Sequence, residues 1–184
     1  ELDDQHAMAY LLNNQEVFDI VGITVNTTSN GGLIDRHYEE AVRILKLFNM
    51  HEKFDVKKGA NGTFEEIRKN LSGEDYDGSE AVDFIIAQAR LHKEDTLTLL
   101  PIGKLTNIAL AIEKAPEIKD YVKVVWLGSN YPDPGEYNLV NDVSALDYLL
   151  EQDVHFELVT VSYNKETGTT AIRVSLAEID SVMP

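Results

Sequence analysis

The sequence predicts an α/β protein with a mainly parallel open sheet and helices on both of its faces. Along the 184 residues, short apolar runs alternate with amphipathic segments, which is typical of β-α-β units. Hydrophobic residues make up 43% of the chain, which is enough for one sizeable buried core. The sequence contains neither an internal repeat nor a linker rich in Pro, Gly or Ser. These observations together predict a single domain over residues 1–184.

The first half of the chain is expected to form a helix, a strand and a second helix. Apolar residues follow two adjacent acids at helical spacing, so the chain opens at the N-terminus of an amphipathic helix. The apolar run over residues 18–25 predicts a buried strand, which a polar loop over 26–32 follows. The i, i+3, i+4, i+7 spacing over 38–48 predicts the next helix. Residues 57–78 are rich in Gly and Asn and predict a long loop with a short helix over 64–69.

The second half of the chain repeats the alternation more regularly. Helices are expected over residues 81–91, 105–114 and 143–151, and strands over 96–102, 122–127 and 155–161. Pro116 ends the middle helix, because proline lacks the backbone N–H and its ring clashes with the preceding turn. Trp126 stands in an apolar run and is expected in the core. The order of these elements favours parallel strands joined by helices.

Composition excludes several classes of function. The 16 basic and 32 acidic residues give a formal charge of −16, which repels a phosphate backbone, so neither nucleic acid nor an anionic membrane is an expected partner. The chain has no cysteine, which excludes disulfides, thiolate metal sites and thiol catalysis. It has no apolar run of the roughly 18 residues that a membrane span needs. The fingerprints G-x-G-x-x-G and G-x-x-x-x-G-K-[ST] are also absent, which disfavours a dinucleotide or P-loop site.

Polar loops after the predicted strands mark the expected ligand site. In an open α/β sheet, ligands bind beyond the carboxyl ends of the strands. The loops at these ends include residues 26–30, 101–104 and 128–138, and they carry many amides and hydroxyls. Asp3 and Asp4 add two carboxylates, which suit a hard cation such as calcium because calcium prefers oxygen ligands. The alternative explanation is structural, since the helix dipole favours acids at a helix N-terminus.

Six segments, in this order along the chain, resemble one enzyme family. They are residues 1–7 (ELDDQHA), 22–25 (GITV), 101–111 (PIGKLTNIALA), 126–128 (WLG), 136–138 (EYN) and Asp142. Their order and spacing are similar to those of the inosine-uridine-preferring nucleoside hydrolases, and the segment over 101–111 is the most specific match. The resemblance covers nearly the whole chain and implies a nucleoside-hydrolase-like, Rossmann-like core. It also implies hydrolysis of the N-glycosidic bond of ribonucleosides to free base and ribose, by calcium-assisted attack of water.

The resemblance implies roles for particular residues. Asp4 resembles a bidentate calcium ligand, and Ile102 stands where the family supplies calcium with a backbone carbonyl. The residues implied to bind the ribose are Asp3, Asn30, Asn130, Glu136 and Asn138. Asn26 competes with Asn30 for this role, because the length of their loop differs from the family pattern.

Several of these residues have structural explanations as well. Asn30 and Asn130 stand in turn-like sequence, where asparagine is common because it tolerates a left-handed backbone. Asn107 is expected to cap or support a helix. His6 lies one turn into the first predicted helix, where packing or surface exposure is expected rather than catalysis. The loop asparagines are therefore open to either explanation on spacing alone.

The sequence departs from the family pattern at its two ends. The general-base Asp of the family would precede Glu1, so no catalytic residue is assigned, and the last calcium-ligand Asp would follow Pro184. The resemblance therefore implies an incomplete domain, without its first strand and C-terminal portion, and a chain that is inactive by itself. The alternative function is a nucleoside-hydrolase-like domain that binds a carbohydrate or nucleoside without hydrolysis. The expected partners are a small ribonucleoside and further copies of the chain, as a dimer or tetramer, in the cytoplasm.

Overall fold

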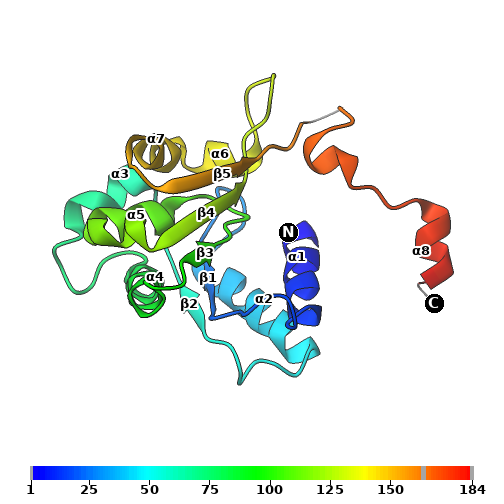
Figure 1. Ribbon diagram of the computed structural model, residues 1–184, viewed down its shortest axis with the longest axis horizontal. Helices are drawn as coiled ribbons and strands as arrows, with labels where there is room; N and C mark the ends of the chain where they lie inside the picture. The colour runs from blue at the N-terminus through cyan, green and yellow to red at the C-terminus, as the bar shows by residue number, and fades with distance from the viewer. Residues whose placement is uncertain (1, 163–164, 183–184) are drawn as a thin grey trace.

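The computed structural model describes residues 2–162 and 165–182, so Glu1 and Pro184 lie outside the described part of the chain. Strands and helices alternate along it, and the strand pairs are parallel, as predicted (Figure 1). The strands are β1 (Ile23–Val25), β2 (Val56–Lys58), β3 (Leu97–Leu99), β4 (Val122–Leu127) and β5 (His155–Val159). The α-helices are α1 (Leu2–Asn13), α2 (Ile34–Leu47), α3 (Phe64–Ile67), α4 (Ser79–Leu91), α5 (Thr106–Lys114), α6 (Tyr137–Asn141), α7 (Val143–Glu151) and α8 (Leu176–Val182). The 3-10 helices are η1 (Arg68–Asn70), η2 (Pro116–Asp120) and η3 (Gly168–Ala171).

The strands form two parallel sheets. In the first, β1 pairs with β2, and Ile23 lies opposite Val56. In the second, the order is β3, β4 and β5, and Val124 lies opposite Phe156. In Figure 1, α4 and α5 lie to the left of the strands and α1 and α2 to the right. The prediction of an open parallel α/β fold with helices on both faces is therefore confirmed.

The predicted bounds of two segments in the first sheet were wrong. The sequence predicts a strand over residues 18–25, whereas the structure has a strand only over the last three of these residues. Among the described residues β1 has one neighbour, the three-residue β2, so no ladder is available to extend the strand backwards. The sequence also predicts a loop from residue 57 onward, whereas β2 occupies its start. The Val-Lys-Lys sequence of β2 has no apolar run that would mark a strand.

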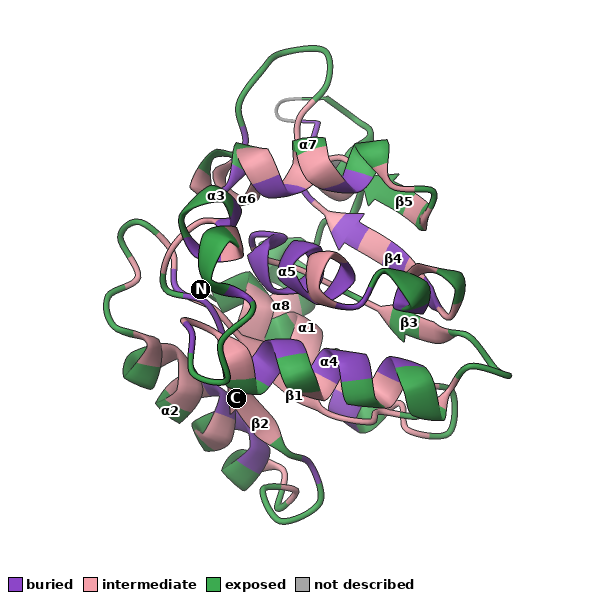
Figure 2. Cartoon of the chain, turned by 90° about the vertical axis from the view of Figure 1, so that its left-hand side faces the viewer, coloured by how far each residue is buried: buried purple, intermediate pink, exposed green. Residues whose placement is uncertain are grey.

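The main core surrounds α5, whose central residues are buried on all sides (Figure 2). Residues 109–112 have no exposed surface, because α3, α4 and α7 pack around this helix. Trp126 of β4 belongs to the same core and is only 1% exposed, which confirms its predicted position. Its indole N–H donates a hydrogen bond to the carbonyl of Gly103 at 2.9 Å. The core therefore also fixes the loop that follows β3.

A smaller core joins α1 and α2 to the first sheet. Leu12 of α1, Ile44 and Leu45 of α2, and Phe54 before β2 are buried together. This packing holds α1 against α2, since the two helices contact each other directly. The position of the acidic first turn of α1 is therefore set by the apolar residues further along the helix.

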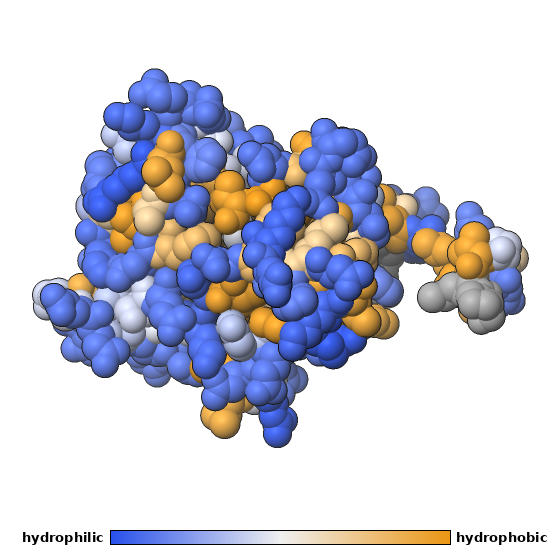
Figure 3. Space-filling view, turned by 90° about the horizontal axis from the view of Figure 1, so that it is seen from below, coloured by the Kyte–Doolittle hydropathy of each residue, from blue (hydrophilic) through white to orange (hydrophobic). Residues whose placement is uncertain are grey.

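The C-terminal segment projects from the rest of the molecule, at the right of Figures 1 and 3. It contains η3 and α8, and its apolar side chains are largely exposed, including Ile172 and Leu176. Figure 3 shows apolar surface on this projecting part. Across the described residues, no helix combines the length and the apolar character that crossing a membrane requires.

Candidate functional site

The carboxyl ends of the strands are linked across the two sheets by asparagine side chains. Asn107, in the first turn of α5, donates from Nδ2 to the carbonyl of Val25 at 3.2 Å and accepts the N–H of Ala60 at 2.9 Å. Asn26 donates to the carbonyl of Lys104 at 3.1 Å. The loops after β1, β2 and β3 are therefore held next to one another. Asn107 was expected to cap or support a helix, and its side chain instead links the loop after β1 to the loop after β2.

Asn138 of α6 connects the loops that follow β3 and β4. Its Nδ2 group donates to the carbonyls of Ile102 and Leu127, both at 2.9 Å. These two bonds use the two amide hydrogens, so Oδ1 is the atom through which this side chain would accept a hydrogen bond from a ligand. The carbonyl of Ile102, which the sequence assigns to calcium, keeps a second lone pair beside the one that Asn138 uses.

Glu136 is buried and organises the loop between β4 and α6. The residue is 6% exposed, and its carboxylate accepts hydrogen bonds from the N–H groups of Ser129 at 2.8 Å, Asn138 at 2.8 Å and Leu139 at 3.0 Å. Glu136 is also the N-cap of α6, where a carboxylate is favoured by the unpaired N–H groups of the first turn. Asn130 lies partly buried in the same loop. Three predicted ribose-binding residues thus belong to one short segment.

The loop after β1 crosses to α6 and carries Asn30. The N–H of Ser29 donates to Oδ1 of Asn141 at 2.6 Å. The hydroxyl of Tyr137 donates to Oδ1 of Asn30. These bonds place Asn30 beside α6, the helix that also carries a predicted ribose-binding residue. Asn26, the competing candidate, is instead engaged with the loop that follows β3.

The two acids in the first turn of α1 have different surroundings. Asp3 is exposed, whereas Asp4 is partly buried. Burial raises the pKa of Asp4, and the neighbouring Asp3 charge adds to this rise, while His37 opposes it. Burial also lowers the pKa of the His37 imidazole. A desolvated carboxylate interacts more strongly with a cation than an exposed one does, because water screens it less.

A buried lysine holds the loop that follows β2. Lys104 is 4% exposed, and its Nζ donates to the carbonyls of Asn61 at 3.1 Å and Gly62 at 2.7 Å. The carboxylate of Asp77 accepts the N–H groups of the same two residues, at 2.9 and 2.7 Å. Burial lowers the pKa of Lys104, and the charges of Asp142 and Asp77 counteract this effect. Lys104 therefore holds this loop through its carbonyl groups, and Asp77 holds it through its N–H groups.

The two predicted calcium ligands are chemically suited to calcium but do not make a full set. The Asp4 carboxylate and the Ile102 carbonyl both offer oxygen, which a hard cation prefers. Calcium takes six to eight such ligands. In residues 2–162 and 165–182, no three His, Cys, Asp or Glu side chains lie together as a metal-binding group. The donor chemistry fits calcium, and the remaining oxygens must come from other groups or from water.

Two charged or titratable groups at this edge have no role in the sequence prediction. Lys104 lies inside the 101–111 segment, and His37 follows the polar loop after β1. A lysine is usually exposed, so nothing in the sequence pattern marks Lys104 as buried, whereas His37 is partly exposed and its Nε2 atom is buried. Both positions depend on loops that come from distant parts of the chain.

Comparison with protein families gives a match over almost the whole chain. A family model described as inosine-uridine preferring nucleoside hydrolase matches residues 1–181. The inosine-uridine preferring nucleoside hydrolase of Leishmania major is 32% identical over 110 residues, which are 56% of this chain and 35% of that protein. A pyrimidine-specific ribonucleoside hydrolase of Shewanella oneidensis is 28% identical over 158 residues, 74% of this chain and 49% of its own length. The chain thus spans about a third to a half of the length of the curated relatives it matches.

Solved structures with similar folds agree with this match. A purine-preferring ribonucleoside hydrolase from Gardnerella vaginalis superposes with a TM-score of 0.65 and 25% identity, over 86% of this chain and 57% of that one. An inosine-uridine preferring nucleoside hydrolase from Bacillus anthracis gives a TM-score of 0.69 at 17% identity, over 97% of this chain and 66% of that one. The second similarity is one of fold.

Proposed function

Because the chain belongs to the inosine-uridine preferring nucleoside hydrolase family, we propose that the protein hydrolyses the N-glycosidic bond of ribonucleosides to free base and ribose. The observation that carries the proposal is the loop network at the carboxyl ends of the strands, where Asn30, Glu136 and Asn138 meet at α6. Amides and carboxylates suit a sugar, because each sugar hydroxyl both donates and accepts a hydrogen bond.

The proposed ribose-binding residues are Asp3, Asn30, Asn130, Glu136 and Asn138. As the base departs, the ribosyl group acquires an oxocarbenium-like positive charge, so the site must orient the sugar and tolerate that charge. Asn138 would contribute its Oδ1 atom, since its amide hydrogens bind Ile102 and Leu127. Glu136 would hold the start of α6 in place through three backbone N–H groups and would offer the ribose the second lone pair of Oε1, beside the one that accepts from Asn138. Such preorganised positioning is a major contribution to catalysis.

Asp4 and the carbonyl of Ile102 are proposed to hold calcium. The partial burial of Asp4 supports this role, because a carboxylate that is partly withdrawn from water interacts more strongly with a cation than an exposed one does. Calcium, when bound, would lower the pKa of the attacking water and contact the sugar hydroxyls. The proposed contribution of the chain is to present these two oxygens beside the ribose-binding loops.

The domain is proposed to be incomplete within residues 1–184, lacking a first strand and a C-terminal portion. One observation supports this: the chain covers 57% to 66% of similar solved structures. The general base is proposed to lie outside the chain, which would then be inactive by itself. Assembly as a dimer or tetramer is a further expectation from the family.

A calcium titration followed by thermal unfolding tests the site. A ligand that binds only the folded state stabilises it, by about 2.7 kcal/mol at a concentration of 100 Kd. We expect calcium to raise the melting temperature, ribose to raise it further, and Asp4→Ala to abolish both shifts. The matched control is Asp19→Ala, because Asp19 is exposed in a loop and has no proposed role. An equal shift in both variants would contradict the assignment of Asp4.

Release of free base from inosine and uridine by the whole protein tests the reaction. We expect base and ribose to appear in equal amounts, in a calcium-dependent manner. Tight binding of ribonucleosides without release would instead favour a binding domain that handles the sugar without cleaving it. Absence of both binding and release would refute the proposed function.

A further inference from the structure

His37 lies directly under the loop that carries Asn30. It belongs to the first turns of α2, and Gly31 lies against its ring. A Cβ atom at Gly31 would lie 2.4 Å from Thr28 Oγ1 and 2.6 Å from His37 Nε2. Glycine is therefore the residue that lets this loop approach the imidazole so closely.

The Nε2 atom of His37 is buried and makes no hydrogen bond of regular geometry with the described residues, although the backbone of Gly31 interacts with the imidazole. A buried polar atom without a partner destabilises the folded protein by about 1–3 kcal/mol. Buried polar side-chain atoms in native proteins usually have a partner, so an exception requires an explanation. The partner must therefore come from outside the described residues, and a bound ligand is one source of it.

The surroundings of His37 connect it to the proposed sugar site. The charges of Asp4 and Lys104 both act on its imidazole, so the ring shares its electrostatic surroundings with the proposed calcium ligand. Asn30 is the residue next to Gly31 in the loop above it. Tyr137 takes up the Oδ1 atom of Asn30, which directs the Nδ2 donor of that side chain away from Tyr137.

We propose that His37 is a further ligand-binding residue of this site, and that its Nε2 atom forms a hydrogen bond with one hydroxyl group of the bound ribose. The inference rests on the proposed function and extends it by one residue. A hydroxyl is the chemical group that fits, because it can donate to an unprotonated Nε2 or accept from a protonated one. A carbonyl or an ammonium group would match only one of these two forms.

The test compares His37→Leu and His37→Gln in the whole protein. Leucine removes the hydrogen-bonding atom at similar size, whereas glutamine can place an amide near the position of Nε2. The probes are inosine and its 2′-deoxy, 3′-deoxy and 5′-deoxy analogues, with Kd measured by calorimetry. We expect His37→Leu to weaken inosine binding about 3- to 10-fold. One of the three analogues should bind His37→Leu as tightly as the unchanged protein, and His37→Gln should restore most of the affinity for inosine.

Stability separates ligand binding from a purely structural role. His37→Leu removes a polar atom that lacks a partner, so the ligand-free protein should be as stable as before or more stable. The control is His51→Leu, an exposed position that should change neither affinity nor stability. Equal weakening for inosine and all three analogues, or none, would overturn the role of His37 while leaving the hydrolase proposal intact. Failure of the unchanged protein to bind inosine would overturn both.

Discussion

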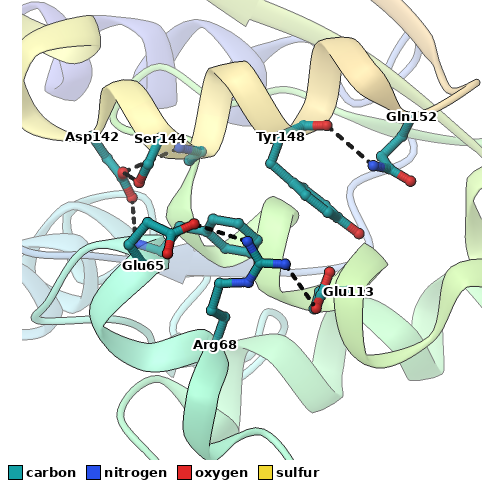
Figure 4. Close-up of polar contacts among 9 residues, drawn as sticks. Glu65, Arg68, Glu113, Asp142, Ser144, Tyr148 and Gln152 are labelled. Carbon is teal, nitrogen blue, oxygen red and sulfur yellow. Dashed lines mark hydrogen bonds and ion pairs between the residues drawn. The ribbon is translucent and has the colours of Figure 1, made fainter.

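Asp142 joins the N-termini of three helices, so its removal should strongly destabilise the fold. Figure 4 shows Asp142 beside Ser144 at the start of α7. Asp142 is 4% exposed, and its carboxylate accepts the N–H of Phe64 at 2.8 Å, at the start of α3, and that of Ala145 at 3.1 Å, in α7. The hydroxyls of Thr106, at the start of α5, and Ser144 donate to the same carboxylate. Asp142→Ala would therefore leave four donors without their acceptor.

The expected loss of unfolding free energy for Asp142→Ala is about 3–7 kcal/mol. Removing the N-cap of α7 costs about 1 kcal/mol. The N–H of Phe64 and the hydroxyl of Thr106 would remain buried without an acceptor, at about 1–3 kcal/mol each. A domain is stable by only about 5–15 kcal/mol in total, so this variant should be close to unfolding.

Urea denaturation followed by circular dichroism at 222 nm measures this loss. Asp142→Asn keeps the shape and one acceptor oxygen, so it should fold and show an intermediate loss. Asp147→Ala is the matched control, because Asp147 is exposed on the same helix and its loss should stay within about 0.5 kcal/mol. A loss below about 1 kcal/mol for Asp142→Ala would refute the reasoning.

Three further predictions concern the supporting structure of the site and the core beside it. A Cβ at Gly59 would lie 2.3 Å from the carbonyl oxygen of Val25, so Gly59→Ala should lower the unfolding free energy by about 1–3 kcal/mol. Gly73→Ala, whose Cβ would meet nothing closer than 3.5 Å, should leave the urea midpoint nearly unchanged. Lys104→Met removes the donor to the carbonyls of residues 61 and 62, so it should lower the unfolding free energy by about 1–3 kcal/mol and speed hydrogen exchange over residues 59–63. Unchanged exchange there would contradict the role of Lys104 in holding this loop. Burial, with a hydrogen bond to Glu113, raises the pKa of Tyr148 above its ordinary value of 10.0. Figure 4 shows the Tyr148 ring pointing from α7 toward Glu113. The folded protein then holds this proton more tightly than the unfolded chain, so the stability that Tyr148 contributes is complete below pH 10.0 and is lost as the pH rises further. The urea midpoint should therefore fall more steeply above pH 10 than it does in Tyr148→Phe; parallel curves would count against this assignment.

Local patterns were sufficient to predict most of the elements. The helix over 143–151 and the strand over 122–127 have the predicted bounds, because clear periodicity or an unbroken apolar run marks each of them. α5 ends at Lys114, shortly before Pro116, as the chemistry of proline requires. The motif over 101–111 was specific enough to indicate the family, which the match over residues 1–181 confirms.

The sequence by itself determined the fold class and the family, and it predicted the loops of the proposed site, because periodicity and motifs report on each element separately. Only the tertiary structure decided which side chains meet in those loops. Ser29 reaches Asn141 across 112 positions, and Tyr137 reaches Asn30 across 107. The burial of the Nε2 atom of His37 likewise depends on the position of the loop after β1. Such contacts follow from the order and register of parallel strands, which bring distant loops to one edge, and no local pattern in the chain records that order.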